Sequence, residues 1–113
     1  MPLIKQSDQG TVKSNIRNGK GRGLAYPSTD TLSEGPISMA SRIELEPEAS
    51  VGFHLHDCDE EVYAIVSGEG IYEFDGGSYP ALPGDIFVTK KGMSHGLKNT
   101  GRETLVFFAV VAS

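Results

Sequence analysis

The stretch that decides the fold runs from Gly52 to Gly68 and reads GFHLHDCDEEVYAIVSG. It places His54 and His56 two residues apart, with Glu61 five residues further on. Residues i and i+2 of a β-strand point to the same face, so the two imidazoles would project side by side. A turn and a returning strand would bring the Glu61 carboxylate to the same point. The stretch therefore predicts two strands that share one polar site.

The third and last histidine of the chain, His95, lies in a second stretch, GDIFVTKKGMSHGLKN, which spans Gly84 to Asn99. Three imidazoles and one carboxylate around an open centre are typical of a site for a divalent transition metal, whether Mn, Fe, Co, Ni, Cu or Zn. We therefore predict one such ion per chain and leave its identity open. The predicted ligands are His54, His56, Glu61 and His95.

The two stretches resemble the two sequence motifs of the cupin superfamily. The first motif is HxH, three or four residues, Glu, six residues and Gly. It corresponds here to His54, His56, Glu61 and Gly68. Glu60 is the competing carboxylate, but the spacing to Gly68 favours Glu61, and Glu60 would then face solvent.

The second cupin motif is Gly, five residues, Pro-x-Gly, two residues, His, three residues and Asn. Gly84, Gly92, His95 and Asn99 match it, and Lys90 stands in place of the proline. That proline stiffens a turn and binds no metal, so we expect the site to be intact without it. The motif glycines fit tight turns, and Asn99 is expected to be structural.

Glycine and proline punctuate the whole chain, with 14 and 6 residues respectively, and no long apolar period of 3.6 residues indicates a helix. Many short strands at close spacing favour a β-sandwich or barrel. The cupin resemblance implies an all-β, single-domain jelly-roll barrel, or double-stranded β-helix, over residues 36–113. The predicted strands are 38–46, 51–56, 61–66, 70–75, 85–89, 94–98 and 104–112.

The connections are predicted from turn residues. Gly76-Gly77 predicts a hairpin turn, and Leu82–Asp85 predicts another. Residues 27–36 are expected to form a loop with one helical turn. Residues 1–35, which include the basic run from Arg17 to Gly23, are predicted to be an N-terminal arm. The arm would add an edge strand to the barrel or cross to a partner subunit.

Counting residues on one face of each strand nominates side chains that would line the barrel near the metal. They are Met39, Ser41, Tyr63, Tyr72, Phe74, Phe87, Leu97 and Phe108. Ordinary core packing is the alternative interpretation for most of them. Arg42 would pair with a ligand carboxylate if it faces inward. Asp57 and Asp59 are expected to be loop carboxylates, and Cys58 a bystander between them, since no further histidine could activate its thiol.

Composition narrows the possible partners. The formal net charge of -5 argues weakly against nucleic acid. The longest apolar run, Leu105–Ala112, is far shorter than the ~20 residues of a membrane span. A single cysteine allows no internal disulfide and fits a cytoplasmic location. The segments 62–66 and 105–111 are apolar on both faces, which predicts a homodimer packed sheet against sheet.

The resemblance implies two alternatives for the function. One is an enzyme of the decarboxylase, isomerase or dioxygenase type acting on a small oxygen-rich anion, such as a dicarboxylate, a hydroxy acid, a sugar acid or a sugar phosphate. The other is a module that binds or senses such an anion without turnover. A general acid or base beside the metal would favour the enzyme, and Tyr63 and Glu60 are the nearby candidates. The small bacterial cupins that the chain most resembles are labelled oxalate-decarboxylase-like or sugar-phosphate-isomerase-like by fold analogy.

Overall fold

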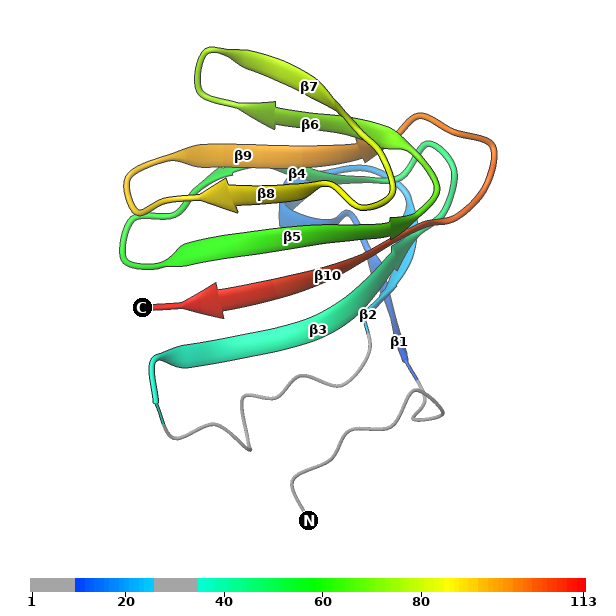
Figure 1. The fold of residues 1–113 in the computed structure, drawn as a ribbon. Coiled ribbons are helices and arrows are strands. Elements are labelled where there is room, and N and C mark those ends of the chain that lie inside the picture. The colour runs from blue at the N-terminus through cyan, green and yellow to red at the C-terminus, as the bar shows by residue number, and fades with distance from the viewer. Residues whose placement is uncertain (1–9, 26–34) are drawn as a thin grey trace.

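Two antiparallel β-sheets packed face to face make up the structure (Figure 1). The computed structural model describes residues 10–25 and 35–113. Within these ranges one 3₁₀ helix, η1, spans Ile16–Asn18. The strands are β1 (Thr11–Ser14), β2 (Arg22–Ala25), β3 (Ile37–Leu45), β4 (Ser50–Leu55), β5 (Glu60–Ser67), β6 (Gly70–Phe74), β7 (Gly77–Ala81), β8 (Ile86–Thr89), β9 (Ser94–Asn99) and β10 (Leu105–Ala112).

The larger sheet has the strand order β1-β2-β3-β10-β5-β8, and the smaller sheet has the order β4-β9-β6-β7. Their facing sides enclose the core, in which Leu45, Leu97, Leu105 and Phe107 are completely buried. This is the all-β jelly roll that the sequence predicted. The β1–β2 hairpin extends the larger sheet beyond β3. No helix in the described part of the chain is long and apolar enough to cross a membrane.

All seven predicted strands are confirmed, and each observed end lies within one residue of its predicted position. The strand β7 was not predicted, because it contains Pro80 and follows two glycines that suggested only a turn. Proline is tolerated there because β7 is the edge strand of its sheet. The β6–β7 hairpin turns through Asp75 and Gly76, one residue earlier than predicted. The helical turn expected within residues 27–36 falls on residues 26–34, which lie outside the described residues.

The prediction that Phe108 lines the barrel interior is wrong. Its side chain is 46% exposed, whereas Phe107 is completely buried and its ring packs 4.8 Å from that of Tyr63. The reason is that every residue from Leu105 to Ala112 is apolar, so alternation could not show which face turns inward. On β4 the polar histidines fixed the faces, and Phe53 and Leu55 point outward as expected.

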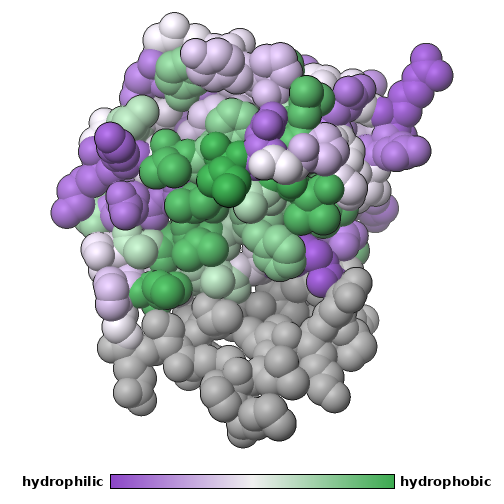
Figure 2. All heavy atoms as spheres, in the orientation of Figure 1, coloured by the Kyte–Doolittle hydropathy of each residue, from purple (hydrophilic) through white to green (hydrophobic). Residues whose placement is uncertain are grey.

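The outer face of the larger sheet is apolar over four adjacent strands, apart from Arg42 on β3. One row of cross-strand neighbours runs from β3 to β8 through Arg42, Phe108, Ala64 and Ile86. The next row contains Ala40, Val110, Val62 and Val88. Figure 2 shows these strands as one hydrophobic patch. Arg42 therefore faces away from the barrel interior, and its Nε lies 3.4 Å from Glu44 Oε2.

The chain around η1 lies against β4 with backbone touching backbone. The Ser50 amide donates to Lys20 O (2.7 Å), and the Lys20 amide donates to Ser50 Oγ (2.9 Å). A Cβ atom on Gly52 would lie 2.1 Å from Arg17 O. A Cβ atom on Gly19 would lie 2.2 Å from Ser50 O. Because no side chain fits between the two segments, this contact requires glycine at both positions.

Replacing Gly52 with alanine should therefore lower the free energy of unfolding by about 1–3 kcal/mol, because the added methyl group pushes η1 off β4. Urea denaturation would measure this change. The matched control is Gly35→Ala, since a Cβ atom there meets nothing within 4 Å. Equal stabilities of the two variants would contradict the close contact.

Candidate metal centre

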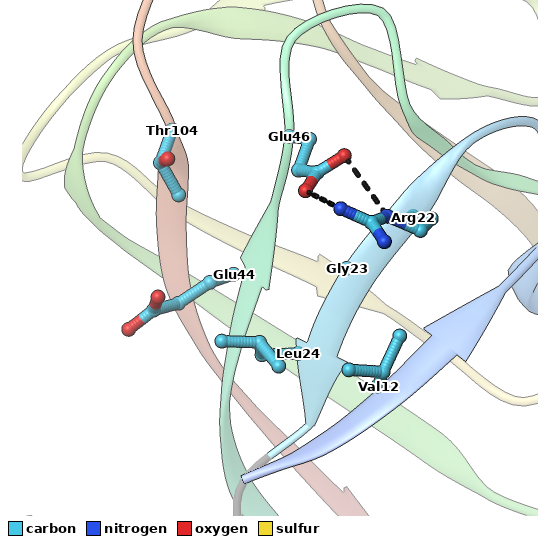
Figure 3. A pocket seen from close by; sticks show the side chains of 7 residues that line it. All are labelled: Val12, Arg22, Gly23, Leu24, Glu44, Glu46 and Thr104. Atoms are coloured by element: carbon cyan, nitrogen blue, oxygen red, sulfur yellow. Dashed lines mark hydrogen bonds and ion pairs between the residues drawn. The ribbon is translucent and has the colours of Figure 1, made fainter.

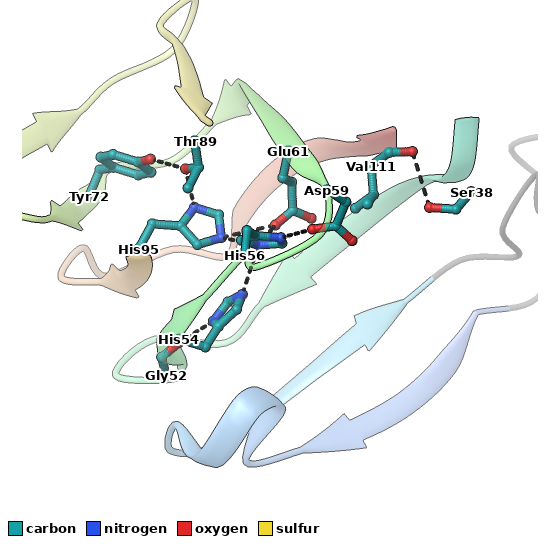
Figure 4. Close-up of polar contacts among 10 residues, drawn as sticks. All are labelled: Ser38, Gly52, His54, His56, Asp59, Glu61, Tyr72, Thr89, His95 and Val111. Atoms are coloured by element: carbon teal, nitrogen blue, oxygen red, sulfur yellow. Dashed lines mark hydrogen bonds and ion pairs between the residues drawn. The ribbon is translucent and has the colours of Figure 1, made fainter. Parts of the chain in front are cut away.

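The four predicted ligands meet between the two sheets (Figure 4). His54 on β4 and His95 on β9 are cross-strand neighbours in the smaller sheet. His56 follows directly after β4, and Glu61 comes from β5 in the larger sheet. One potential ligand atom from each side chain lies within 4.8 Å of the other three. Together the four form a group that could hold a metal ion.

Backbone hydrogen bonds hold His56 in place beyond the end of β4. Its amide donates to Met93 O (3.0 Å), and its carbonyl accepts from the Gly92 amide (2.7 Å).

A tight turn precedes His95. It is closed by a hydrogen bond from the Met93 amide to Lys90 O (3.0 Å). Gly92 has a φ of +88° in this turn, which favours glycine. The turn thus forms with Lys90 in the position where the cupin motif has proline.

Hydrogen bonds at Nδ1 fix the tautomers of His54 and His56. Nδ1 of His54 donates to Gly52 O (2.6 Å), and Nδ1 of His56 donates to Asp59 Oδ1 (2.6 Å). A carbonyl and a carboxylate can only accept, so each neutral ring carries its proton on Nδ1. The Nε2 atoms of both rings are left with lone pairs that can bind a metal.

Thr89 orients the ring of His95 from the opposite sheet. It lies on β8 as the cross-strand neighbour of Glu61, and it is only 1% exposed. Its Oγ1 shares one hydrogen bond with His95 Nδ1 (2.7 Å) and a second with the Tyr72 hydroxyl. All three imidazoles therefore turn Nε2 toward one centre.

The ligand atoms are spaced as a metal would hold them. Nε2 of His56 lies 3.2 Å from Nε2 of His54 and 3.0 Å from Nε2 of His95. Oε1 of Glu61 lies 3.1 Å from His56 Nε2 and 2.9 Å from His95 Nε2. Ligands about 2.1 Å from an ion are about 3.0 Å apart at right angles and about 3.4 Å apart at tetrahedral angles. The four distances therefore lie in the range expected for atoms that share one ion.

Burial sets the electrostatics of the cluster. It lowers the pKa of His54, against a smaller opposing effect of the hydrogen bond to Gly52. Burial, followed by the charge of Glu61, raises the pKa of Tyr63 well above its usual value. The Tyr63 hydroxyl therefore stays protonated beside the Glu61 carboxylate. Glu60, by contrast, is exposed on the other face of β5.

The other side chains nominated for the barrel interior lie at varying depth. Tyr63 stacks on His95, with ring centroids 4.8 Å apart, and Tyr72 stacks on Phe87 at 4.2 Å. Ser41 and Leu97 are buried, and Met39, Phe74 and Phe87 pack partly buried against the core. That these residues line a ligand pocket stays a prediction.

Sequence reasoning missed two residues of the site, Asp59 and Thr89. Asp59 was expected to be an ordinary loop carboxylate, yet it holds the ring of His56. Its signal was a carboxylate three residues after a ligand histidine. Thr89 had a weaker signal, a hydroxyl at a strand position that proves to be buried.

Cys58 is exposed, and a hydrogen bond with Asp57 raises the pKa of its thiol, so the thiol stays protonated.

A surface hollow of about 300 Å³ lies away from the cluster, where β1, β2 and β3 meet β10 (Figure 3). Arg22 and Glu46 form an ion pair across it at 2.9 Å, and their side chains are 64% and 50% exposed. Solvent screens such a pair, so it contributes little to stability.

Comparison with known proteins supports the fold. The sequence model of the family described as "Cupin domain" matches residues 41–111. The chain is 36% identical over 99 residues to an oxalate-binding protein of Thermotoga maritima, a match that covers 87% of this chain and 82% of the relative.

Two solved structures are similar over nearly the whole chain. One is a predicted oxalate decarboxylase of Thermotoga maritima, with a TM-score of 0.90, 32% identity and coverage of 99% of this chain and 98% of that one. The other is a Cupin 2 conserved barrel domain protein from Salinispora arenicola. Its TM-score is 0.73 and its identity 22%, over 98% of this chain and 88% of that one, which shows the fold alone.

Replacing Asp59 with asparagine should weaken metal binding by about 10- to 100-fold, because the side chain that fixes the tautomer of His56 loses its charge. Competition with a chromogenic chelator would measure the affinity. Asp57→Asn is the matched control in the same loop and should bind metal like the wild type. Equal affinities for the two variants would show that Asp59 does not orient the ligand.

Proposed function

The chain belongs to the cupin family, and from that premise we propose that it binds one divalent transition-metal ion and uses it to hold a small oxygen-rich anion. The observation that supports this most is the convergence of three histidine Nε2 atoms and the Glu61 carboxylate. Electron-rich atoms about 3 Å apart in a buried site repel one another unless a cation joins them. The donor set of His54, His56, Glu61 and His95 suits Mn, Fe, Co, Ni, Cu or Zn equally.

The nature of the ligand follows from coordination number and charge. On a six-coordinate ion, these four protein atoms would leave two positions for a chelating molecule. A dication with one carboxylate carries a net positive charge, which favours an anion. The Thermotoga relative described as oxalate-binding supports a small dicarboxylate or hydroxy acid. A sugar acid or sugar phosphate is a larger alternative of the same class.

Of the two alternatives, an enzyme and a binding module, the nearby side chains favour the binding module. Tyr63 is buried and held protonated, so it cannot serve as a base near neutral pH. Glu60 lies on the outward face of β5. Neither of the two candidates is therefore suited to act as a general base at the metal, and Tyr63 would serve only as a proton donor. A bound metal would still polarise a ligand oxygen or lower the pKa of bound water, which is the chemistry that an enzymatic role would use.

We expect oxalate to stabilise the protein only when it is loaded with metal. At 100 times its dissociation constant the gain in unfolding free energy should be about 2.7 kcal/mol. A thermal-shift assay with oxalate, malonate and a neutral diol, with and without metal, would measure it. His95→Ala should lose both the metal, by elemental analysis, and the response to oxalate. Equal shifts with and without metal would mean that the anions bind elsewhere on the surface.

We also propose that the protein is a homodimer and that its apolar outer sheet face is the interface. Ile86, Val88 and Phe108 are 66%, 50% and 46% exposed on that face. A two-fold axis would place the same patch of both copies in contact, which covers it completely. The cytoplasmic location stays a prediction that rests on the single cysteine.

Light scattering should therefore give twice the mass of one chain at micromolar concentration. Ile86→Lys should shift the mass toward the monomer, because a charge would be buried within the interface. Phe53→Lys places the same charge at a 53% exposed position of the other sheet and should leave the mass unchanged. A wild type that is monomeric in this assay would refute the dimer.

A further inference from the structure

His95 differs from the other two histidines of the cluster in the partner of its Nδ1 atom. His54 and His56 each direct Nδ1 at an oxygen that can only accept, a backbone carbonyl and a carboxylate respectively. Nδ1 of His95 lies 2.7 Å from the Thr89 hydroxyl, which can either donate or accept. His95 is therefore the one histidine of the cluster whose tautomer is left open by its partner.

The hydroxyl of Tyr72 extends this contact into the core. It shares a hydrogen bond with the Thr89 hydroxyl, and its ring stacks on Phe87 with centroids 4.2 Å apart. His95 and Thr89 are each 1% exposed, and Tyr72 is 4% exposed. Within residues 10–25 and 35–113, neither hydroxyl makes a further hydrogen bond. Tyr72, Thr89 and His95 thus form one buried chain of hydrogen bonds (Figure 4).

Without a metal ion, one direction of this chain gives every proton an acceptor. Tyr72 donates to Thr89, and Thr89 donates to His95 Nδ1, which leaves the ring proton on Nε2. That proton has two acceptors, since His95 Nε2 lies 2.9 Å from Glu61 Oε1 and 3.0 Å from His56 Nε2. Buried donors without acceptors are costly, so this direction is favoured. A proton then joins the electron-rich atoms that a metal would otherwise join.

The direction must reverse when His95 Nε2 binds a metal ion. A nitrogen that binds a metal carries no proton, so the neutral ring holds its proton on Nδ1 and donates to Thr89. The Thr89 proton then turns to the Tyr72 oxygen, and each hydroxyl points its oxygen toward the positive charge, which favours this orientation. The ring is neutral in both states, because Nε2 releases one proton and Nδ1 takes up another.

We propose, on the basis of the proposed function, that Thr89 and Tyr72 are positioning residues that form a reversible hydrogen-bond chain. Through this chain His95 holds a proton on Nε2 without metal and gives that proton up when the metal binds. A hydroxyl suits position 89 because it can serve Nδ1 as a donor in one state and as an acceptor in the other. A carbonyl or a carboxylate would lock the tautomer of His95, as it does for the other two histidines.

Nitrogen-15 NMR of the full chain tests the reversal, because ring nitrogens with and without a proton differ in chemical shift. Spectra are recorded at about pH 8, where a free imidazole is neutral, before and after an equimolar amount of zinc is added. We expect His95 to carry its proton on Nε2 before zinc and on Nδ1 after it. His54 and His56 are internal controls and should carry theirs on Nδ1 in both spectra. A His95 proton found on Nδ1 before zinc is added would overturn the reversible chain.

Zinc affinity separates the role of the hydroxyls from that of side-chain shape. Thr89→Val keeps the branched shape without the hydroxyl and should bind zinc about 10- to 100-fold more weakly, because His95 Nδ1 loses its acceptor. Thr89→Ser keeps a hydroxyl and should bind like the wild type. Tyr72→Phe keeps the stacked ring and should fall in between, because Thr89 can still accept from Nδ1. Equal zinc affinities of Thr89→Val and Thr89→Ser would also overturn the proposal.

Two further measurements separate the possible failures. Circular dichroism of each variant should match the wild type, which shows that a lost affinity is not a lost fold. A wild type that takes up no zinc in elemental analysis would overturn the proposed function and the reversal with it. The spectrum recorded without metal would still decide where His95 holds its proton, so the two failures are distinguishable.

Discussion

Mutual repulsion among four ligand atoms is the constraint on which the site depends. Left alone, three imidazole lone pairs and a carboxylate would move apart, so the scaffold must hold them rigidly. The smaller sheet supplies the histidines, the larger sheet supplies Glu61, and the packed core keeps the sheets at a fixed separation. Thr89 on the larger sheet shares hydrogen bonds with His95 and Tyr72 on the smaller sheet, and these join the sheets again at the site itself. The fold and the site thus stabilise each other once a cation is bound.

Spacing along the chain was enough to predict the cluster. His54 and His56 share a face because strand geometry repeats every two residues, and a motif with fixed gaps placed Glu61 and His95. Polar residues in an apolar background also fixed which face of β4 turns inward. Strand positions could be predicted because glycine and proline mark where one strand ends and the next begins.

Contacts made across space could not be predicted in the same way. Thr89 orients His95 from the other sheet, and no spacing rule connects them. Phe107 and Phe108 lie in a strand without polar residues, so nothing in the local pattern could tell the buried ring from the exposed one. The role of η1 depends on two glycines, Gly19 and Gly52, that are far apart in sequence and meet only in the folded chain. The basic run from Arg17 to Gly23 was predicted to lie in an N-terminal arm, but its contact with β4 could not be inferred from its residues.

The central place of β10 has a consequence for how the chain folds. A ribosome makes this strand after all the other described strands, yet β3 and β5 are joined only through it. Until it emerges, two apolar strands have unpaired edges and no neighbour between them. Non-local pairing of this kind slows folding and leaves a period during which nascent chains can associate wrongly. High-level expression should therefore be sensitive to temperature and to the supply of chaperones, even though the finished barrel is well packed.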